Sequence, residues 1–140
     1  ERADRELLAC VRRLGPAQRR IVTDHDAFGY LARRYGIDVV GTVIPSQTTR
    51  AQASAGDLAR LERTIRREGV TAVFPETSVN ADLARRLARD TGASADHTLY
   101  GDTLGARDGS AGTYLGMLAV NGRELVSGMS GGRLGCRIAT

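Results

Sequence analysis

The sequence of 140 residues contains no lysine, no tryptophan, only six aromatic residues and only two histidines. All 20 basic residues are therefore arginines, and 16 acidic residues are interleaved with them, which leaves a net charge of +4. In "LARLERTIRRE" the arginines share one predicted helix with Glu62 and Glu68, which is typical of a solvated helical face. With so few aromatics for base stacking, this mixed charge does not indicate nucleic acid as a partner.

Long apolar runs are also missing, since none approaches the roughly 18 to 20 residues that a membrane-spanning helix needs. The first residues, "ERADRELLAC", read as a helix rather than as a secretion signal. No GxxxxGK[ST], GxGxxG or GxSxG motif occurs, so a phosphate-binding loop, a dinucleotide fingerprint and a serine-hydrolase elbow are not indicated. The length fits one domain with one sizeable core.

Helical patterns that end in glycine and pass directly into apolar strands dominate the chain. Gly36, Gly69 and Gly92 suit the left-handed position that closes a helix. Strands are expected near residues 19–23, 37–44, 70–75 and 96–100. Because strands that alternate with helices favour parallel pairing, we predict an α/β fold with a four-stranded parallel sheet flanked by helices.

The predicted helices carry recognisable start signals and apolar faces. "SAGD", Ser54 to Asp57, makes a capping box, and Ser78 or Asn80 would cap the next helix. The last helix has a stripe that consists of Tyr114, Met117, Leu118, Asn121 and Leu125.

Cys10 and Cys136 lie near opposite ends of the chain. A disulfide between them is geometrically feasible, because the termini of an α/β domain often lie close together. Two separate buried thiols fit the residues equally well.

Candidate site residues follow the predicted strands at their carboxyl ends, where ligands bind in parallel sheets. Asp24, His25 and Asp26 follow the first strand, Glu76 the third, and Asp102 the fourth. We expect His25 at or near the N-cap of a helix that begins around Ala27, where the helix dipole favours the neutral imidazole that binds metal. On the residues alone, a capping role for this histidine remains open.

A second interpretation of the same residues is a stand-alone flavodoxin-like domain. It would use the acidic cluster of Asp24, Asp26 and Glu76 for magnesium-dependent phosphoryl transfer. Such a domain needs a lysine or a glycine-rich phosphate loop near the cluster, and the sequence has neither.

Several motifs resemble the metal-binding subunits of bacterial zinc and manganese ABC importers. "TDHDAFGYLARRYGIDVVG" is similar to the segment in which a metal-binding histidine follows the first strand of the second lobe. "EGVTAVFPETSVN" resembles the family's strand that ends in Phe-x-Glu, and "GDTLG" its loop with the last ligating aspartate. "AGTYLGMLAVN" resembles its Thr-Tyr-x-x-Met helix. The likeness covers nearly the whole chain.

The resemblance implies a ligand set and an architecture. His25 and Asp102 would bind the ion, and Glu76 would lie beside the site rather than on the ion. Family members bind the metal between two lobes joined by a long helix, and the first lobe supplies two further histidines. The chain would then be the C-terminal lobe, a Rossmann-like lobe of a two-lobed periplasmic binding protein, and residues 1–14 would be the end of the linking helix. The uncapped helical start at Glu1 agrees with this expectation.

Two departures from the family pattern and one unassigned histidine accompany the resemblance. Ala111 stands where many members have Asp, and Gly122 where a charged residue is usual. We expect both to affect helix packing more than ligation. His97 has no role in the family pattern.

The implied function is capture of a divalent transition metal outside the cytoplasm and its delivery to an ABC permease, without enzymatic activity. A histidine at position 25, where manganese-selective relatives have a carboxylate, favours Zn²⁺ over Mn²⁺ as the ligand, although Mn²⁺ stays open. The protein would be periplasmic or lipid-anchored at the outer face of the cell membrane. Its expected partners are the permease, the metal ion and the missing N-terminal lobe.

Overall fold

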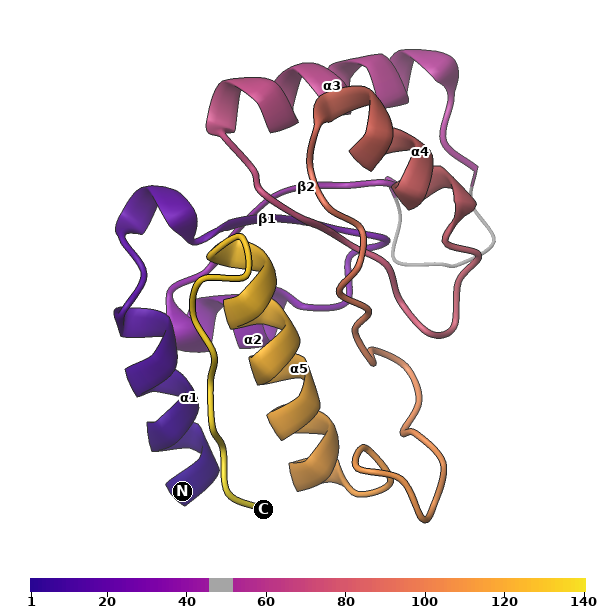
Figure 1. The fold of residues 1–140 in the computed structure, drawn as a ribbon. Helices are drawn as coiled ribbons and strands as arrows, with labels where there is room; N and C mark the ends of the chain where they lie inside the picture. Colours follow the sequence, from indigo (N-terminus) through magenta and orange to yellow (C-terminus); the bar gives the residue numbers. More distant parts are fainter. Residues whose placement is uncertain (46–51) are drawn as a thin grey trace.

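The computed structural model describes residues 1–45 and 52–140. A small parallel sheet of three strands lies at its centre, with β2 (Asp38–Thr42), β1 (Arg20–Thr23) and β3 (Val73–Phe74) side by side in that order. Helices α3 (Ala55–Glu68) and α4 (Asp82–Thr91) cover one face of the sheet. Helices α1 (Arg2–Arg12), α2 (Gly29–Tyr35) and α5 (Tyr114–Met129) cover the other, and a short 3-10 turn, η1 (Pro16–Gln18), leads into β1 (Figure 1). The predicted α/β fold with parallel pairing is confirmed.

Side chains that alternate along the strands divide the core into two layers. Ile21 and Phe74 point into the layer of α1, α2 and α5, whereas their neighbours Val22 and Val73 point into the layer of α3 and α4. This is the period of two that a strand buried on both faces requires. Within the described residues, no helix is long and apolar enough to cross a membrane.

The expected fourth strand is wrong for the described part of the chain. Residues 96–100 form no strand, and their segment touches β3 and its extension only through the parallel bridges Ala72↔Ser94 and Glu76↔Leu99. Val73 and Thr77 donate their N–H groups to Ser94 and Leu99, respectively. The residue midway between these two donors is Pro75, which has no N–H to give, so the ladder is interrupted there.

The helix boundaries follow the predicted signals closely, with three exceptions. Gly36, Gly69 and Gly92 close α2, α3 and α4 in the left-handed conformation, with φ of 68°, 63° and 79°. Ser54 and Asp57 form the predicted capping box of α3.

The exceptions concern α4, α5 and α2. Ala81, not Ser78 or Asn80, is the N-cap residue of α4, and Asn80 contributes by accepting from the N–H of Asp82. In α5, Tyr114 is exposed rather than part of the buried stripe. The third exception is α2, which begins at Gly29 rather than around Ala27.

The C-terminal segment runs back along α1 and is fastened to it. Cys10 and Cys136 form a disulfide, with their Cα atoms 5.6 Å apart, so the bridged alternative holds. Arg13 donates to the carbonyl of Gly135 at 3.0 Å, and Ala139 N–H donates to Glu6 at 2.7 Å. Closing so long a loop stabilises the fold by about 4 to 5 kcal/mol on the chain-entropy estimate.

Candidate metal site

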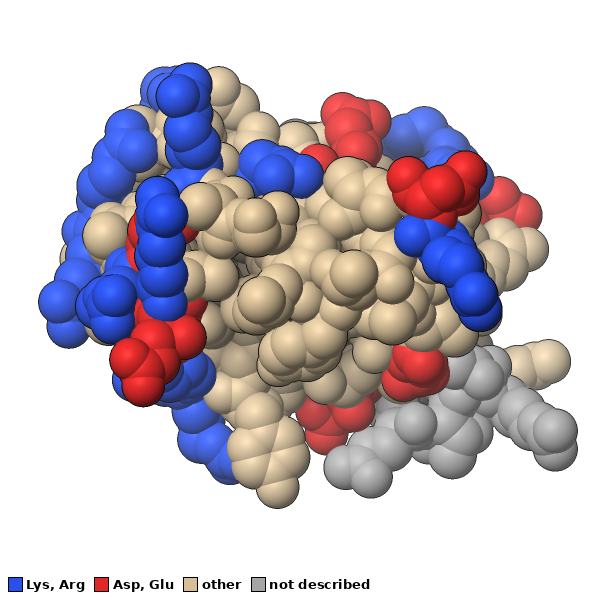
Figure 2. Space-filling model, turned by 90° about the horizontal axis from the view of Figure 1, so that it is seen from below, with Lys and Arg blue, Asp and Glu red and all other residues tan. Residues whose placement is uncertain are grey.

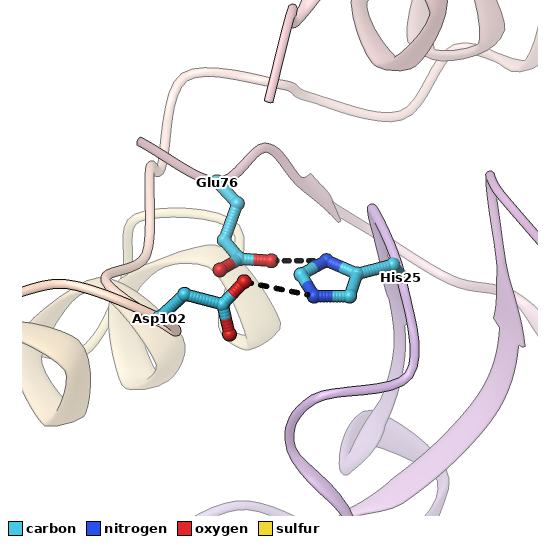
Figure 3. Close-up of side chains that lie close together, drawn as sticks. All are labelled: His25, Glu76 and Asp102. Atoms are coloured by element: carbon cyan, nitrogen blue, oxygen red, sulfur yellow. Dashed lines mark ion pairs between the residues drawn. The ribbon is translucent and has the colours of Figure 1, made fainter. Parts of the chain in front are cut away.

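His25, Glu76 and Asp102 meet at the carboxyl edge of the sheet, although they come from three separate segments (Figure 3). His25 lies just after β1, Glu76 two residues after β3, and Asp102 beyond the segment that makes the isolated bridges. One potential ligand atom from each residue lies within 4.8 Å of the others. In the described residues this is the one group of three or more His, Cys, Asp or Glu side chains with such spacing.

The two ring nitrogens of His25 face two different carboxylates. Nε2 lies 3.5 Å from Oδ2 of Asp102, and Nδ1 lies 2.5 Å from Oε2 of Glu76 (Figure 3). Two ligand atoms bound tetrahedrally to one zinc ion lie about 3.4 Å apart, given metal–ligand distances of about 2.0 to 2.1 Å. The Nε2–Asp102 separation therefore matches that of a pair that shares one ion.

The contact between Nδ1 and Glu76 is close in distance but not aligned as a hydrogen bond. Both atoms are buried and have no hydrogen-bond partner among the described residues. The contact is therefore a close approach of two buried polar atoms and not a hydrogen bond. It leaves Nδ1 occupied by an acid and Nε2 free to face Asp102.

The two acids that face His25, Glu76 and Asp102, differ in how far they are buried. The side chain of Glu76 is fully buried, whereas that of Asp102 is 53% exposed. Burial raises the pKa of Glu76, and the nearby Asp102 and Asp24 act in the same direction, while His25 opposes them. Asp102 thus stands at the open rim of the site, with His25 and Glu76 behind it.

Asp24 holds the backbone of Glu76 through a hydrogen bond. It is buried, and its Oδ2 accepts from the backbone N–H of Glu76 at 2.7 Å. Burial also raises the pKa of this carboxyl, against the effect of that hydrogen bond. Asp26 is exposed and does not join the group, so the acidic cluster of the magnesium interpretation is not assembled as expected.

His25 is not the N-cap residue that the sequence suggested. The chain turns after β1, where the carbonyl of His25 accepts from Ala27 N–H and from the hydroxyl of Thr23. Helix α2 begins only at Gly29, with Phe28 as its N-cap residue. The ring of His25 therefore has no capping role at α2.

A missing side chain makes room for Glu76. A Cβ atom on Gly101 would collide with the carboxylate of Glu76, because this group packs directly against the Gly101 backbone. In the sequence, Gly101 is only the first residue of the "GDTLG" loop. The steric need for glycine beside Asp102 appears only when the two segments are seen together.

The remaining residues singled out in the sequence have other roles. His97 Nδ1 lies 2.8 Å from Glu124 on α5, and this histidine does not belong to the group of His25, Glu76 and Asp102. Gly122 packs against Leu7 and Ile138, where a Cβ atom would clash, so the expected effect on helix packing is confirmed for this departure. Ala111 is buried in the loop before α5, and its carbonyl accepts from Gly105 N–H. The loop after β2 falls partly in residues 46–51, outside the described residues.

Fold and site together define an α/β domain with a histidine–carboxylate site at the carboxyl edge of a parallel sheet, a class that suits a divalent metal. Residues 1–128 match the family model described as zinc-uptake complex component A, periplasmic. The chain belongs to this family.

Curated relatives and solved structures agree with that assignment. The chain is 36% identical over 122 residues to the zinc-binding protein TroA of Treponema pallidum, which is 82% of this chain and 39% of that protein. It is 31% identical to the manganese-binding lipoprotein MntA of Halalkalibacterium halodurans over 81% of this chain and 37% of the relative. The solved TroA structure matches 91% of this chain and 46% of its own, with a TM-score of 0.79 and 30% identity.

A Mn-bound periplasmic metal-binding protein from Candidatus Liberibacter asiaticus shares the fold, with a TM-score of 0.80 at 24% identity, over 91% of this chain and 46% of its own. The chain thus spans about two fifths of the length of the two curated relatives above. Both are named as binding proteins and not as enzymes, in agreement with the prediction that the chain is not an enzyme.

Proposed function

We propose that this chain is one lobe of a protein that captures a divalent transition metal outside the cytoplasm and delivers it to an ABC permease. His25 binds the ion through Nε2 and Asp102 binds it through its carboxylate. The observation that carries the proposal is their separation of 3.5 Å, with Asp102 at the exposed rim. Glu76 lies on the other ring nitrogen and keeps Nε2 directed at the ion, as carboxylate partners of ligating histidines do.

Two protein ligands do not close a metal site, so further donors must come from elsewhere. We assign them to a second lobe, which corresponds to the part of the relatives that this chain does not span. Residues 1–14 would then belong to the helix that joins the lobes. Zn²⁺ is the favoured ion because imidazole suits it better than it suits the harder Mn²⁺.

A face beside the site supports a covering lobe. Tyr30, Tyr114 and Leu115 are each at least half exposed, and they line a pocket of about 490 Å³ that reaches Gly101, next to Asp102. Figure 2 shows the lower end of the molecule, where uncharged side chains fill the centre and arginines gather along one margin. Uncharged, partly apolar surface of this kind is typical of a face that another part of the protein covers.

The test is titration of Zn²⁺ and of Mn²⁺ into the protein that contains this chain and into its His25→Ala variant. Loss of a ligand should weaken zinc binding by at least about a hundredfold. This is more than the loss expected when a residue that only contacts a ligand is removed. His97→Ala is the matched control, because it removes the other imidazole and should leave affinity unchanged. An unaltered zinc affinity of the His25 variant would remove the main ligand from the proposal.

A further inference from the structure

We propose that Asn121 on α5 is a positioning residue that holds Asp102 in place for the ion; this inference rests on the proposed function. Asn121 is 2% exposed and forms two hydrogen bonds with one residue of the ligand segment. Its Oδ1 accepts from the N–H of Tyr100 at 2.9 Å, and its Nδ2 donates to the carbonyl of Tyr100 at 2.8 Å. One side chain thus pairs with both backbone polar groups of a residue two positions before Asp102.

The segment before Asp102 is fixed from both sides. On the side of β3, Leu99 N–H donates to the carbonyl of Pro75 at 2.8 Å, and Thr77 N–H donates to the carbonyl of Leu99 at 3.0 Å. On the other side, Asn121 takes the place that a further strand would occupy. Because residues 96–100 form no regular strand, the sheet alone does not supply this second side.

Asp102 depends on this anchor because little else holds its backbone. In the described part of the chain, the next backbone hydrogen bond after Tyr100 is that between Gly105 N–H and the carbonyl of Ala111. Residues 101–104 therefore form no backbone–backbone hydrogen bond in that part of the chain, although the backbone of Gly101 packs against the Glu76 carboxylate. The position of the Asp102 carboxylate therefore depends mainly on the hydrogen bonds between Asn121 and the backbone of Tyr100.

An amide is the one small side chain that suits this task. It offers an acceptor and a donor side by side, which match the N–H and C=O of one peptide residue. It is also uncharged, so it adds no competing carboxylate near the cation. Removing it leaves two partly buried backbone groups of Tyr100 without partners, which the chain would relieve by shifting the segment.

The experiment measures zinc affinity of Asn121→Leu and Asn121→Ala in the protein that contains this chain. Leucine keeps the branched shape of the side chain and removes both hydrogen bonds, and alanine covers the case in which the larger leucine does not fit. We expect affinity to fall by about 10- to 100-fold, the usual cost of losing a partner that orients a ligand. In an Asp102→Ala background, the same substitution should change affinity by less than about twofold, because Asn121 acts through Asp102.

Glu124→Ala is the matched control. Glu124 lies on the same helix and contacts the same segment, but it does so at His97, away from Asp102. Its loss should change zinc affinity by no more than about twofold. A loss equal to that of Asn121→Leu would point to general loosening of α5 and overturn the inference.

Two further outcomes would overturn it. One is an Asn121→Leu variant whose zinc affinity equals that of the wild type, or falls equally with and without Asp102. The other is unchanged hydrogen exchange of the Tyr100 amide in the chelator-treated variant, since the lost acceptor should speed that exchange. Failure of the proposed function is distinct: His25→Ala and Asp102→Ala would both keep wild-type affinity, and hydrogen exchange would still decide whether Asn121 holds the segment.

Discussion

The two histidines of the chain each have a glutamate at Nδ1, yet only one of them lies at a candidate metal site. His97 pairs with Glu124 of α5 at 2.8 Å, and both side chains are partly exposed. His25 pairs with Glu76 at 2.5 Å, and both of these side chains are buried. The difference lies at the other ring nitrogen: Nε2 of His25 faces a second acid, Asp102, at 3.5 Å.

A histidine–glutamate pair is therefore not sufficient to indicate metal binding. Such a pair orients the ring and fixes which nitrogen is free, and it does so equally well at a structural contact. The additional feature at His25 is a carboxylate from a distant segment, held at the spacing of two ligands to one ion. The comparison supports the proposal that Glu76 orients the ring of His25 and that Asp102 binds the ion.

The strongest way to test this comparison is to remove the glutamate from each histidine. In Glu76→Ala, the ring of His25 loses its buried partner and can turn away, so zinc affinity should fall by about 10- to 100-fold. In Glu124→Ala, His97 loses its partner far from the site, and affinity should stay within about twofold of the wild type. Calorimetric titration of both variants measures the difference, and equal affinities would contradict the role given to Glu76.

A smaller effect is expected from Gly101→Ala. The new methyl group would occupy the space of the Glu76 carboxylate and push it from Nδ1 of His25. Zinc affinity should fall by about tenfold, less than with loss of the whole carboxylate, because part of the contact can recover.

Gly29→Ala is the control for that substitution. A Cβ atom there meets nothing within 4 Å, and Gly29 also lies close to the site in sequence, at the start of α2. It should leave zinc affinity unchanged. A loss in this variant as large as that in Gly101→Ala would mean that any added methyl group near the site disturbs it.

Much of the fold could be predicted because its signals are local. Glycines in the left-handed conformation at the ends of α2, α3 and α4, and the capping box of Ser54 and Asp57, depend only on neighbouring residues. The fourth strand failed because its ladder depends on a distant partner, Pro75, which cannot donate a hydrogen bond. The N-cap role of His25 failed because the turn after β1 uses its carbonyl, and α2 starts later.

The meeting of His25 with Asp102 could be expected from the rule that loops at the carboxyl ends of parallel strands converge. The resemblance to a family added their roles. Nothing in the sequence alone showed that Glu76 fills the space left by Gly101, or that Asn121 grips Tyr100. Both contacts join segments more than 20 residues apart, so no spacing along the chain reports them. A buried asparagine within an apolar stripe was the one signal available for Asn121.

The smallest expected effect is on the pH dependence of stability in the metal-free protein. Burial, the largest cause, raises the pKa of Glu76 above its ordinary value of 4.5, so the folded chain holds this proton more tightly than the unfolded chain does. The free energy of unfolding therefore falls as pH rises from that ordinary value through the raised one. Glu76→Gln removes this titration, so its stability relative to the wild type should increase over the same pH range and level off above it.

The surface acid Asp4 should change the free energy of unfolding with pH in the opposite direction. The hydrogen bond from Arg34 lowers the pKa of Asp4, so ionisation of Asp4 adds stability as pH rises. Relative to the wild type, Asp4→Asn should therefore lose stability with rising pH, where Glu76→Gln gains it. Denaturant unfolding with a chelator present, followed from about pH 2 to pH 8, measures both differences, because the Asp4 difference develops below the ordinary pKa of 3.8 and the Glu76 difference above 4.5. Curves for Glu76→Gln and the wild type that stay parallel would mean that the buried acid beside His25 keeps an ordinary pKa, and the contrast between site and surface carboxylates would be lost.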